Sequence, residues 1–153
     1  MDTREQPTER ARKRYQDFGI AYDRRKLEYG DYSAEVTAGA QVISMERAVV
    51  IERKMNISEL CSCFCHERKR FTAEMERARA DGAKIYLLVE GGSWEKVYAG
   101  SYRSQMQPKA LVASILAFCA RYNLMIVFCR ADTSGKLIAD ILYRETKEIL
   151  KNY

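Results

Sequence analysis

Val49-Val50-Ile51-Glu52-Arg53-Lys54 (residues 49–54) is a short apolar run that ends directly in three charged residues. A continuous apolar run of this length is typical of a strand buried on both faces at the centre of a sheet. Side chains two apart on a strand point to the same face, so Glu52 and Lys54 project together. Burying these charges is costly unless they are paired, solvated or bound to a metal. The stretch therefore predicts a central strand that carries chemistry at its end.

Two further apolar runs and three helical patterns follow this strand. Residues 85–89 and 124–129 have the composition of buried strands. A helix is expected from Asn56 or Ser58 to about Ala80, because both first residues are good N-caps. Apolar side chains at helical spacing predict two more helices, at about 109–121 and 133–150. Strands interleaved with helices indicate an α/β fold in which helices cover a mixed sheet.

The chain before residue 49 brings a second acidic residue towards the same place. A polar helix is expected at about 5–18, ended by Gly19, and strands are expected between 20 and 36. Asp31 follows a glycine at a strand bend, from which it can reach the end of the 49–54 strand.

Length and composition restrict the class of protein. With 153 residues, 47% hydrophobic content and only two prolines, the chain is expected to form one globular domain over 1–153. No apolar run is long enough to cross a bilayer, and the charged N-terminus lacks the apolar stretch of a signal peptide, so an intracellular protein is expected. The net charge of +5 and the basic clusters at 12–14, 24–26 and 68–70 suit a polyanionic partner. Such clusters are also common on solvated faces.

The cysteines invite a zinc interpretation that we do not favour. The segment 61–66 reads Cys-Ser-Cys-Phe-Cys-His, and on a helix Cys61 and Cys65 share a face while Cys63 points elsewhere. No second Cys/His pair lies at zinc-finger spacing. Reduced, buried thiols are the preferred interpretation.

Asp31, Glu52 and Lys54 have a natural chemical interpretation as a metal site. Mg²⁺ prefers hard oxygen ligands and keeps several waters, so two carboxylates and a backbone carbonyl can hold it. A bound metal would lower the pKa of a water and polarise a phosphate, and a lysine can stabilise the developing charge. The alternative from spacing alone is a surface salt bridge at a strand end.

Several segments occur together in one order that is specific to a known family. They are Asp2-Thr3-Arg4-Glu5, Gly30-Asp31, the 50–54 segment, Leu60, Arg70 and Leu87-Leu88-Val89-Glu90-Gly91. Together they resemble the nuclease domain of the XPF-type structure-specific endonucleases, including the archaeal Hef nuclease, in the PD-(D/E)XK superfamily. The resemblance implies a restriction-endonuclease-like fold with a mixed central sheet flanked by helices. It also implies a metal-dependent DNA endonuclease that acts at branched DNA or at single/double-strand junctions.

The resemblance also implies a role for individual residues. Asp31 and Glu52 would be metal ligands together with the backbone carbonyl of Arg53, and Lys54 would be the catalytic lysine. The metal would be Mg²⁺, for which Mn²⁺ can substitute. Asp2 would lie at the edge of the site, as a further candidate metal ligand. The residues expected to contact DNA are Arg4, Arg53 and Arg70.

Three features depart from the family pattern. The family's first strand normally precedes the Asp-x-Arg-Glu element, whereas this sequence begins at Met1. The spacer of 20 residues between Asp31 and Glu52 is long, which predicts an extended hairpin. The acidic residue expected four places after the lysine is Ser58, with Glu59 one place late. Glu59 either supports the metal site or only completes a capping box with Asn56.

The partners implied are DNA and a second nuclease domain, in a homodimer or heterodimer formed through the C-terminal helices. Two alternative functions stay open. One is a catalytically silent DNA-binding or scaffolding subunit, and the other is a restriction-type or recombination-type nuclease of the same superfamily.

Overall fold

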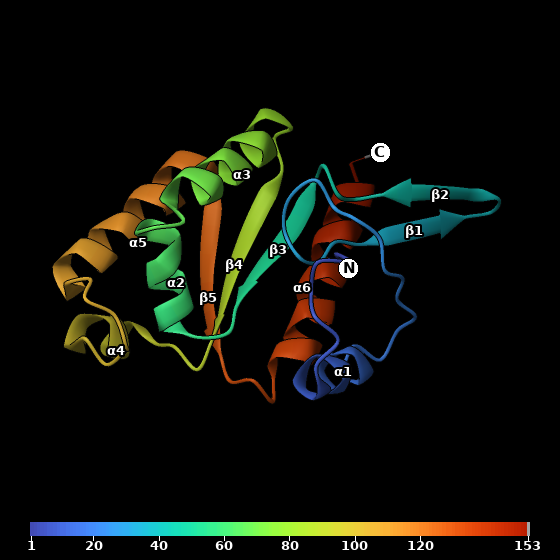
Figure 1. The fold of residues 1–153 in the computed structure, drawn as a ribbon. Helices are drawn as coiled ribbons and strands as arrows, with labels where there is room; N and C mark the ends of the chain where they lie inside the picture. Colours follow the sequence, from blue (N-terminus) through green and yellow to red (C-terminus); the bar gives the residue numbers. More distant parts are fainter. Residues whose placement is uncertain (153) are drawn as a thin grey trace.

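A parallel three-stranded sheet forms the centre of the computed structural model, which describes residues 1–152 (Figure 1). Its strands lie in the order β3 (Val49–Lys54), β4 (Lys84–Glu90) and β5 (Leu124–Cys129). In this register Glu52 pairs with Leu87, and Glu90 pairs with Cys129. All three predicted strands are therefore present, and their carboxyl ends meet at one edge of the sheet.

Helices cover both faces of this sheet (Figure 1). α2 (Ile57–Phe64), α3 (Arg68–Ala80) and α5 (Pro108–Tyr122) lie on one face, and α1 (Glu9–Gln16) and α6 (Ser134–Leu150) lie on the other. The short α4 (Trp94–Ala99) packs beside α5.

The side chains of β4 alternate between these two layers, as a strand requires. Ile85, Leu87 and Val89 pack towards α2, α3 and α5, whereas Tyr86 and Leu88 pack towards α6. The predicted α/β fold with flanking helices is confirmed.

The outer edge of β3 carries the antiparallel part of the sheet and a hairpin. Tyr32 forms a single antiparallel bridge with Ile51, so β3 has a neighbour on both sides. β1 (Glu35–Ala38) and β2 (Gln41–Ser44) then form a separate two-stranded hairpin that projects from the body of the molecule (Figure 1). The extended hairpin expected in the long spacer is therefore present.

The N-terminal region differs from the expected strands. Pairing between 20 and 36 is confined to the Tyr32 bridge and the start of β1. One reason is that several backbone donors in this segment bind acidic side chains instead of a neighbouring strand. The N–H of Leu27 donates to Asp2 (2.8 Å), and the N–H of Gly30 donates to Glu74 (2.9 Å).

The helix expected over 56–80 is two helices, because the chain breaks at Cys65 (φ −107°, ψ −108°). The break lets Phe64 and Phe71, from different helices, both pack on Phe118, with ring centroids 5.0 and 5.5 Å away. The short helix α4, capped by Ser93, was not predicted from the sequence.

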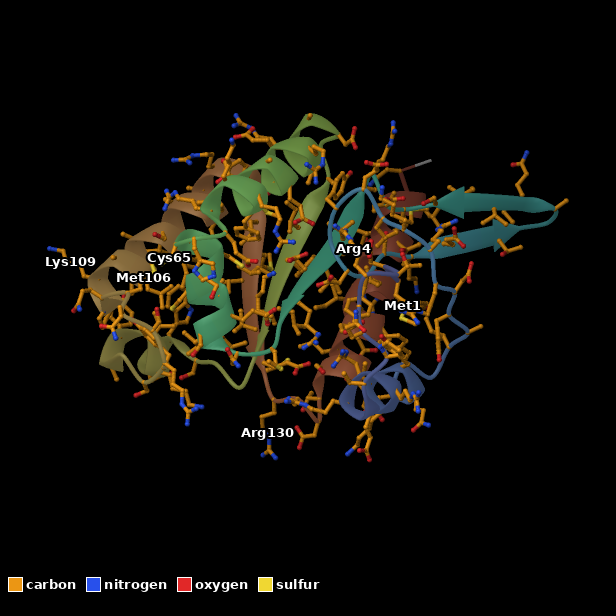
Figure 2. The ribbon with its side chains drawn as sticks, in the orientation of Figure 1. Met1, Arg4, Cys65, Met106, Lys109 and Arg130 are labelled. Carbon is orange, nitrogen blue, oxygen red and sulfur yellow. The ribbon has the colours of Figure 1, made fainter. Side chains whose placement is uncertain are left out.

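Cys61 and Cys63 are buried in the core, whereas Cys65 is exposed and lies 3.8 Å from the sulfur of Met106 (Figure 2). No helix in residues 1–152 is both long and apolar enough to span a membrane.

Candidate active site

Asp31 reaches the edge of β3 through a corner that only glycine fits easily. Gly30 has φ +71°, and a Cβ at this position would lie 2.9 Å from Cβ of Val50. Beyond the corner, the N–H groups of Asp31 and Tyr32 both donate to the carbonyl of Ile51 (2.8 and 3.1 Å). The backbone thus fixes Asp31 beside the carboxyl half of β3.

Glu52 and Lys54 lie on the face of β3 that is covered by α2 and α3, as their spacing predicts. Both are buried, and the Lys54 ammonium forms an ion pair with Oε1 of Glu52. Nζ of Lys54 also lies 5.4 Å from the centroid of the Phe71 ring, a cation–π distance. The Glu52 carboxylate and the Phe71 ring thus hold the buried Lys54 ammonium in one position, from which it can contact a second anion.

A pocket of about 270 Å³ brings these residues together. The structure places seven of the eight predicted site residues in its lining, and Asp2 is the one outside it. The lining residues are Arg4, Glu5, Asp31, Glu52, Arg53, Lys54, Glu59, Arg70, Phe71 and Glu74.

The electrostatics of the pocket favour a cation. Burial raises the pKa of Glu52, and the charge of Asp31 raises it further, against the opposing effect of Lys54. Burial also raises the pKa of Asp31, although the N–H of Arg53 and the charge of Lys54 act against this. For Lys54, burial lowers the pKa but the Glu52 carboxylate outweighs it, so the pKa is raised and the ammonium stays charged. The carboxylates of Asp31 and Glu52 therefore lie close together, and Lys54 neutralises their negative charge only in part.

The donor set fits a hard divalent cation that keeps much of its water. Within residues 1–152 there is no group of three or more His, Cys, Asp or Glu side chains arranged to hold a metal directly. Mg²⁺ needs only one or two carboxylates because waters and phosphate oxygens complete its shell. Oδ1 of Asp31 and Oε2 of Glu52 accept no hydrogen bond from the residues that the structure describes, so both remain available.

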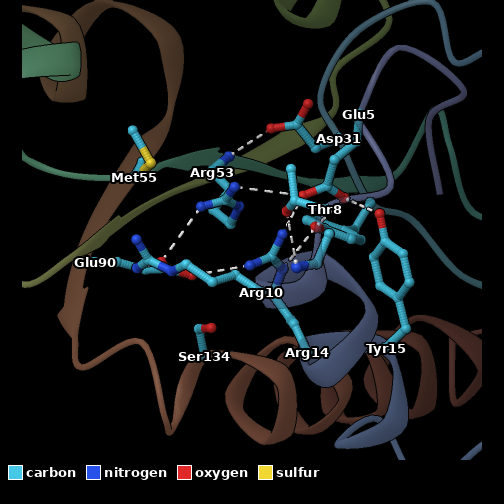
Figure 3. Close-up of polar contacts among 12 residues, drawn as sticks. Glu5, Thr8, Arg10, Arg14, Tyr15, Asp31, Arg53, Met55, Glu90 and Ser134 are labelled. Carbon is cyan, nitrogen blue, oxygen red and sulfur yellow. Dashed lines mark hydrogen bonds and ion pairs between the residues drawn. The ribbon is translucent and has the colours of Figure 1, made fainter.

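Arg53 points to the opposite face of β3, where it joins a buried ion-pair network (Figure 3). Its guanidinium lies 3.4 Å from Glu5 and 3.3 Å from Glu90, and Arg14 contacts the same two acids. This network attaches α1 and the N-terminal segment to the ends of β3 and β4. The predicted DNA contact by the Arg53 guanidinium would compete with these two acids.

Arg4 and Arg70 are exposed residues of the pocket lining. Arg4 lies beside β3 (Figure 2) and binds the Asp2 carboxylate through Nε at 2.8 Å. Arg70, on α3, forms an ion pair with Glu67 at 3.2 Å. Both side chains can therefore face a phosphate from solvent.

Asp2 and Glu59 have structural partners of their own. Asp2 is fully buried, and its carboxylate accepts hydrogen bonds from the N–H groups of Arg4 and Leu27 as well as the Arg4 guanidinium. Glu59 is exposed; its N–H donates to Asn56 (2.8 Å) and its carboxylate accepts from the N–H of Met55 (2.5 Å). The capping contact is thus present, and support of the metal by Glu59 stays a prediction.

Three acids of the site region had no role in the sequence analysis. Glu5 and Glu90 fell within the family-like segments but were given none. Helical periodicity could have identified Glu74 from the sequence. It shares the buried face of α3 with Phe71, Met75 and Ala78, where an acid is out of place unless it has a partner.

Comparison with known proteins identifies the family. A family model described as the ERCC4 domain matches residues 1–141. Among solved structures, the chain is similar to XPF from Aeropyrum pernix, with a TM-score of 0.63 and 18% sequence identity over 95% of this chain. It spans 59% of that structure's length. No curated protein matches the sequence. Because the family model covers most of the sequence, the chain belongs to the ERCC4 domain family, the XPF-type nuclease domains.

Proposed function

We propose that residues 1–153 form one nuclease domain that hydrolyses phosphodiester bonds of DNA with Mg²⁺ or Mn²⁺. The substrate proposed is branched DNA or a single/double-strand junction. The observation that carries the proposal is the convergence of Asp31, Glu52 and Lys54 in one pocket, from two segments separated by a hairpin.

The protein's contribution is to place charges around the phosphate that is cut. Asp31, Glu52 and the carbonyl of Arg53 would hold the metal, which supplies Lewis acidity and a water of lowered pKa. Lys54, kept charged by Glu52, stabilises negative charge that develops on the phosphate. Phe71 and Glu52 hold the ammonium in position before the substrate arrives, so little reorganisation is needed.

Binding of the DNA backbone relies on the basic rim rather than on the acidic floor of the pocket. Arg4 and Arg70 are exposed on two sides of the pocket and can neutralise phosphates that flank the cut. The net charge of +5 supports attraction of a polyanion over a longer range. An intracellular location, where the DNA substrate is found, follows from this function.

A cleavage assay tests the proposal. The chain is incubated with flap, fork, four-way junction and linear duplex DNA, with Mg²⁺, with Mn²⁺ or with EDTA, and Glu52→Gln serves as the negative control. We expect metal-dependent cutting of branched substrates and little cutting of linear duplex. Binding of DNA without any cutting would indicate a silent subunit instead. Equal cutting of linear and branched DNA would indicate a restriction-type specificity.

A further inference from the structure

Glu74 is a buried acid of the pocket that the proposed mechanism does not use. It lies on the inner face of α3 and is only 8% exposed, between the apolar residues of that helix and the pocket. Burial of an ionised carboxylate costs free energy, so a glutamate here requires compensation. A role in the functional site is one source of this compensation.

One oxygen of Glu74 has a clear structural task. Oε1 accepts a 2.9 Å hydrogen bond from the N–H of Gly30. Gly30 is the corner that aims Asp31 at β3, so α3 and the corner are joined at this point. A glutamine could accept the same hydrogen bond without carrying a charge. The hydrogen bond therefore does not explain the negative charge.

None of the ion pairs of the pocket within residues 1–152 includes Glu74. Lys54 pairs with Glu52, Arg53 pairs with Glu5, and Arg4 pairs with Asp2 outside the lining. Among residues 1–152, the acids of the lining that form no ion pair are Asp31, Glu59 and Glu74, and of these Glu59 is exposed. Burial is the largest cause of the raised pKa of Glu52 and of Asp31. The charge of Glu74 is a further cause that raises both pKa values. A divalent cation in the pocket would compensate all three acids.

We propose that Glu74 is the third acidic residue of the metal site. It positions Asp31 through Gly30, and its charge increases the affinity of the pocket for a divalent cation. It acts on the water that the metal keeps rather than as a direct ligand, since no three acids are arranged for direct coordination in the described part of the chain. This inference rests on the proposed metal-dependent function and names a further residue of that site.

The test measures metal affinity directly rather than cleavage. Binding of Mn²⁺ to the full chain is followed by the loss of the free Mn²⁺ signal in electron paramagnetic resonance. Glu74→Gln keeps an acceptor for the N–H of Gly30 and removes the charge. We expect about tenfold weaker Mn²⁺ binding, as is usual for residues that act through a metal's outer shell. The melting temperature without metal should rise, because a buried charge is removed from beside two other acids while the acceptor for Gly30 is kept.

Glu76→Gln is the matched control. Glu76 lies on the same helix, and it accepts a 2.9 Å hydrogen bond from Tyr122, which a glutamine can also accept. It is exposed and outside the pocket. The same substitution should therefore leave Mn²⁺ affinity unchanged.

Glu74→Asp separates the charge from the hydrogen bond, because it keeps the carboxylate on a shorter side chain. We expect it to bind Mn²⁺ more tightly than Glu74→Gln does while melting at a lower temperature than the wild type. Wild-type Mn²⁺ affinity in Glu74→Gln, or weaker binding by Glu74→Asp than by Glu74→Gln, would overturn the inference.

Failure of this inference and failure of the proposed function give different results. If the wild type and Glu74→Gln bind Mn²⁺ equally while Glu52→Gln does not, only the role of Glu74 is wrong. If the wild type binds Mn²⁺ but cuts no DNA, the nuclease assignment fails and the affinities still decide the role of Glu74. A wild-type chain that binds no Mn²⁺ overturns both.

Discussion

The backbone N–H of Arg53 donates a 2.8 Å hydrogen bond to Oδ2 of Asp31. Asp31 thus completes the edge of β3 at the point where its backbone pairing with the preceding segment ends. The other oxygen of this carboxylate stays available on the pocket side. One residue therefore ends the edge of the sheet and leaves an oxygen available to the proposed metal.

The first prediction concerns the three central residues. Asp31→Asn and Glu52→Gln each remove a charged ligand while keeping the shape of the side chain, so cleavage should fall by more than about 100-fold. DNA affinity, measured by gel shift, should stay the same or increase because negative charge is lost. Lys54→Ala should abolish cleavage too, and should lower the melting temperature because Glu52 is left buried without its partner. Near-normal cutting by Glu52→Gln would show that the site is misassigned.

The glycine corner gives a second prediction. Gly30→Ala combines positive φ with a Cβ 2.9 Å from that of Val50, so it should cost about 2–4 kcal/mol in urea unfolding. It should also reduce cleavage, because Asp31 is displaced. Gly39→Ala is the control, since Gly39 has φ +61° but no atom within 4 Å of the added Cβ. It should cost only about 1 kcal/mol and leave cleavage unchanged. Equal losses in the two variants would contradict the close contact with Val50.

The stability of the fold should fall in acid because of Asp2. Burial raises the pKa of this carboxyl, but hydrogen bonds from Arg4 and from the N–H of Leu27 outweigh burial and lower it below its ordinary value. The Asp2 carboxylate therefore makes its full contribution to the free energy of unfolding above the unfolded-state pKa of about 3.9. This contribution is lost as the pH falls through the lower folded-state pKa. Asp2→Asn should lose about 1–2 kcal/mol at pH 7, and the difference from the wild type should narrow below about pH 4.

Urea unfolding at several pH values measures this difference. Asp132→Asn, at an exposed pair with Arg130, should show no such dependence. A constant difference between Asp2→Asn and the wild type from pH 7 to pH 3 would count against the role of Asp2.

Self-association is the fourth prediction, and the structure makes it more specific. α5 and α6 lie on opposite faces of the sheet, so a single compact interface uses mainly one of them. α6 borders an apolar groove of about 590 Å³, and its Tyr143 is 63% exposed. We expect a dimer by light scattering at tens of micromolar, roughly the range of modest interfaces. Tyr143→Glu should shift it to monomer, whereas Leu116→Glu on α5 should not. A wild-type monomer at these concentrations would argue against pairing.

The start of α2 provides the last prediction. Asn56→Ala removes the N-cap and should cost about 1 kcal/mol. Glu59→Gln keeps an acceptor for the N–H of Met55, and the carboxylate it replaces is exposed. We therefore expect little change in stability and a smaller change in the Mg²⁺ requirement than Glu74→Gln causes. A large rise in the Mg²⁺ requirement of Glu59→Gln would instead assign the third acid to Glu59.

The sheet could be predicted from the sequence because its strands are short, continuous apolar runs, a pattern typical of strands buried on both faces. The split between α2 and α3 could not be predicted in this way. No glycine or proline marks Cys65, and the break is decided by the packing of Phe64 and Phe71 on the distant Phe118. Local sequence carries no record of such a contact.

The candidate site, like the fold, could be predicted from the sequence only in part. Glu52 and Lys54 followed from strand periodicity, and Asp31 followed from the glycine before it. Glu5 and Glu90 meet around Arg53 only in three dimensions, across α1, β3 and β4. Ion-pair partners separated by this much of the chain leave no spacing pattern, so their network had to be seen in the structure.

The β1–β2 hairpin is inserted between two residues that line one pocket, Asp31 and Glu52, and yet it projects from the body of the molecule and contributes no residue to the lining (Figure 1). The tip of the hairpin, at Gly39 and Ala40, is exposed. A Cβ added at Gly39 would have no atom within 4 Å. Exposed loop tips of this kind tolerate added chain well. A fluorophore or a tether can therefore be attached at the tip, so that single molecules are followed while they search DNA, without a label at either terminus.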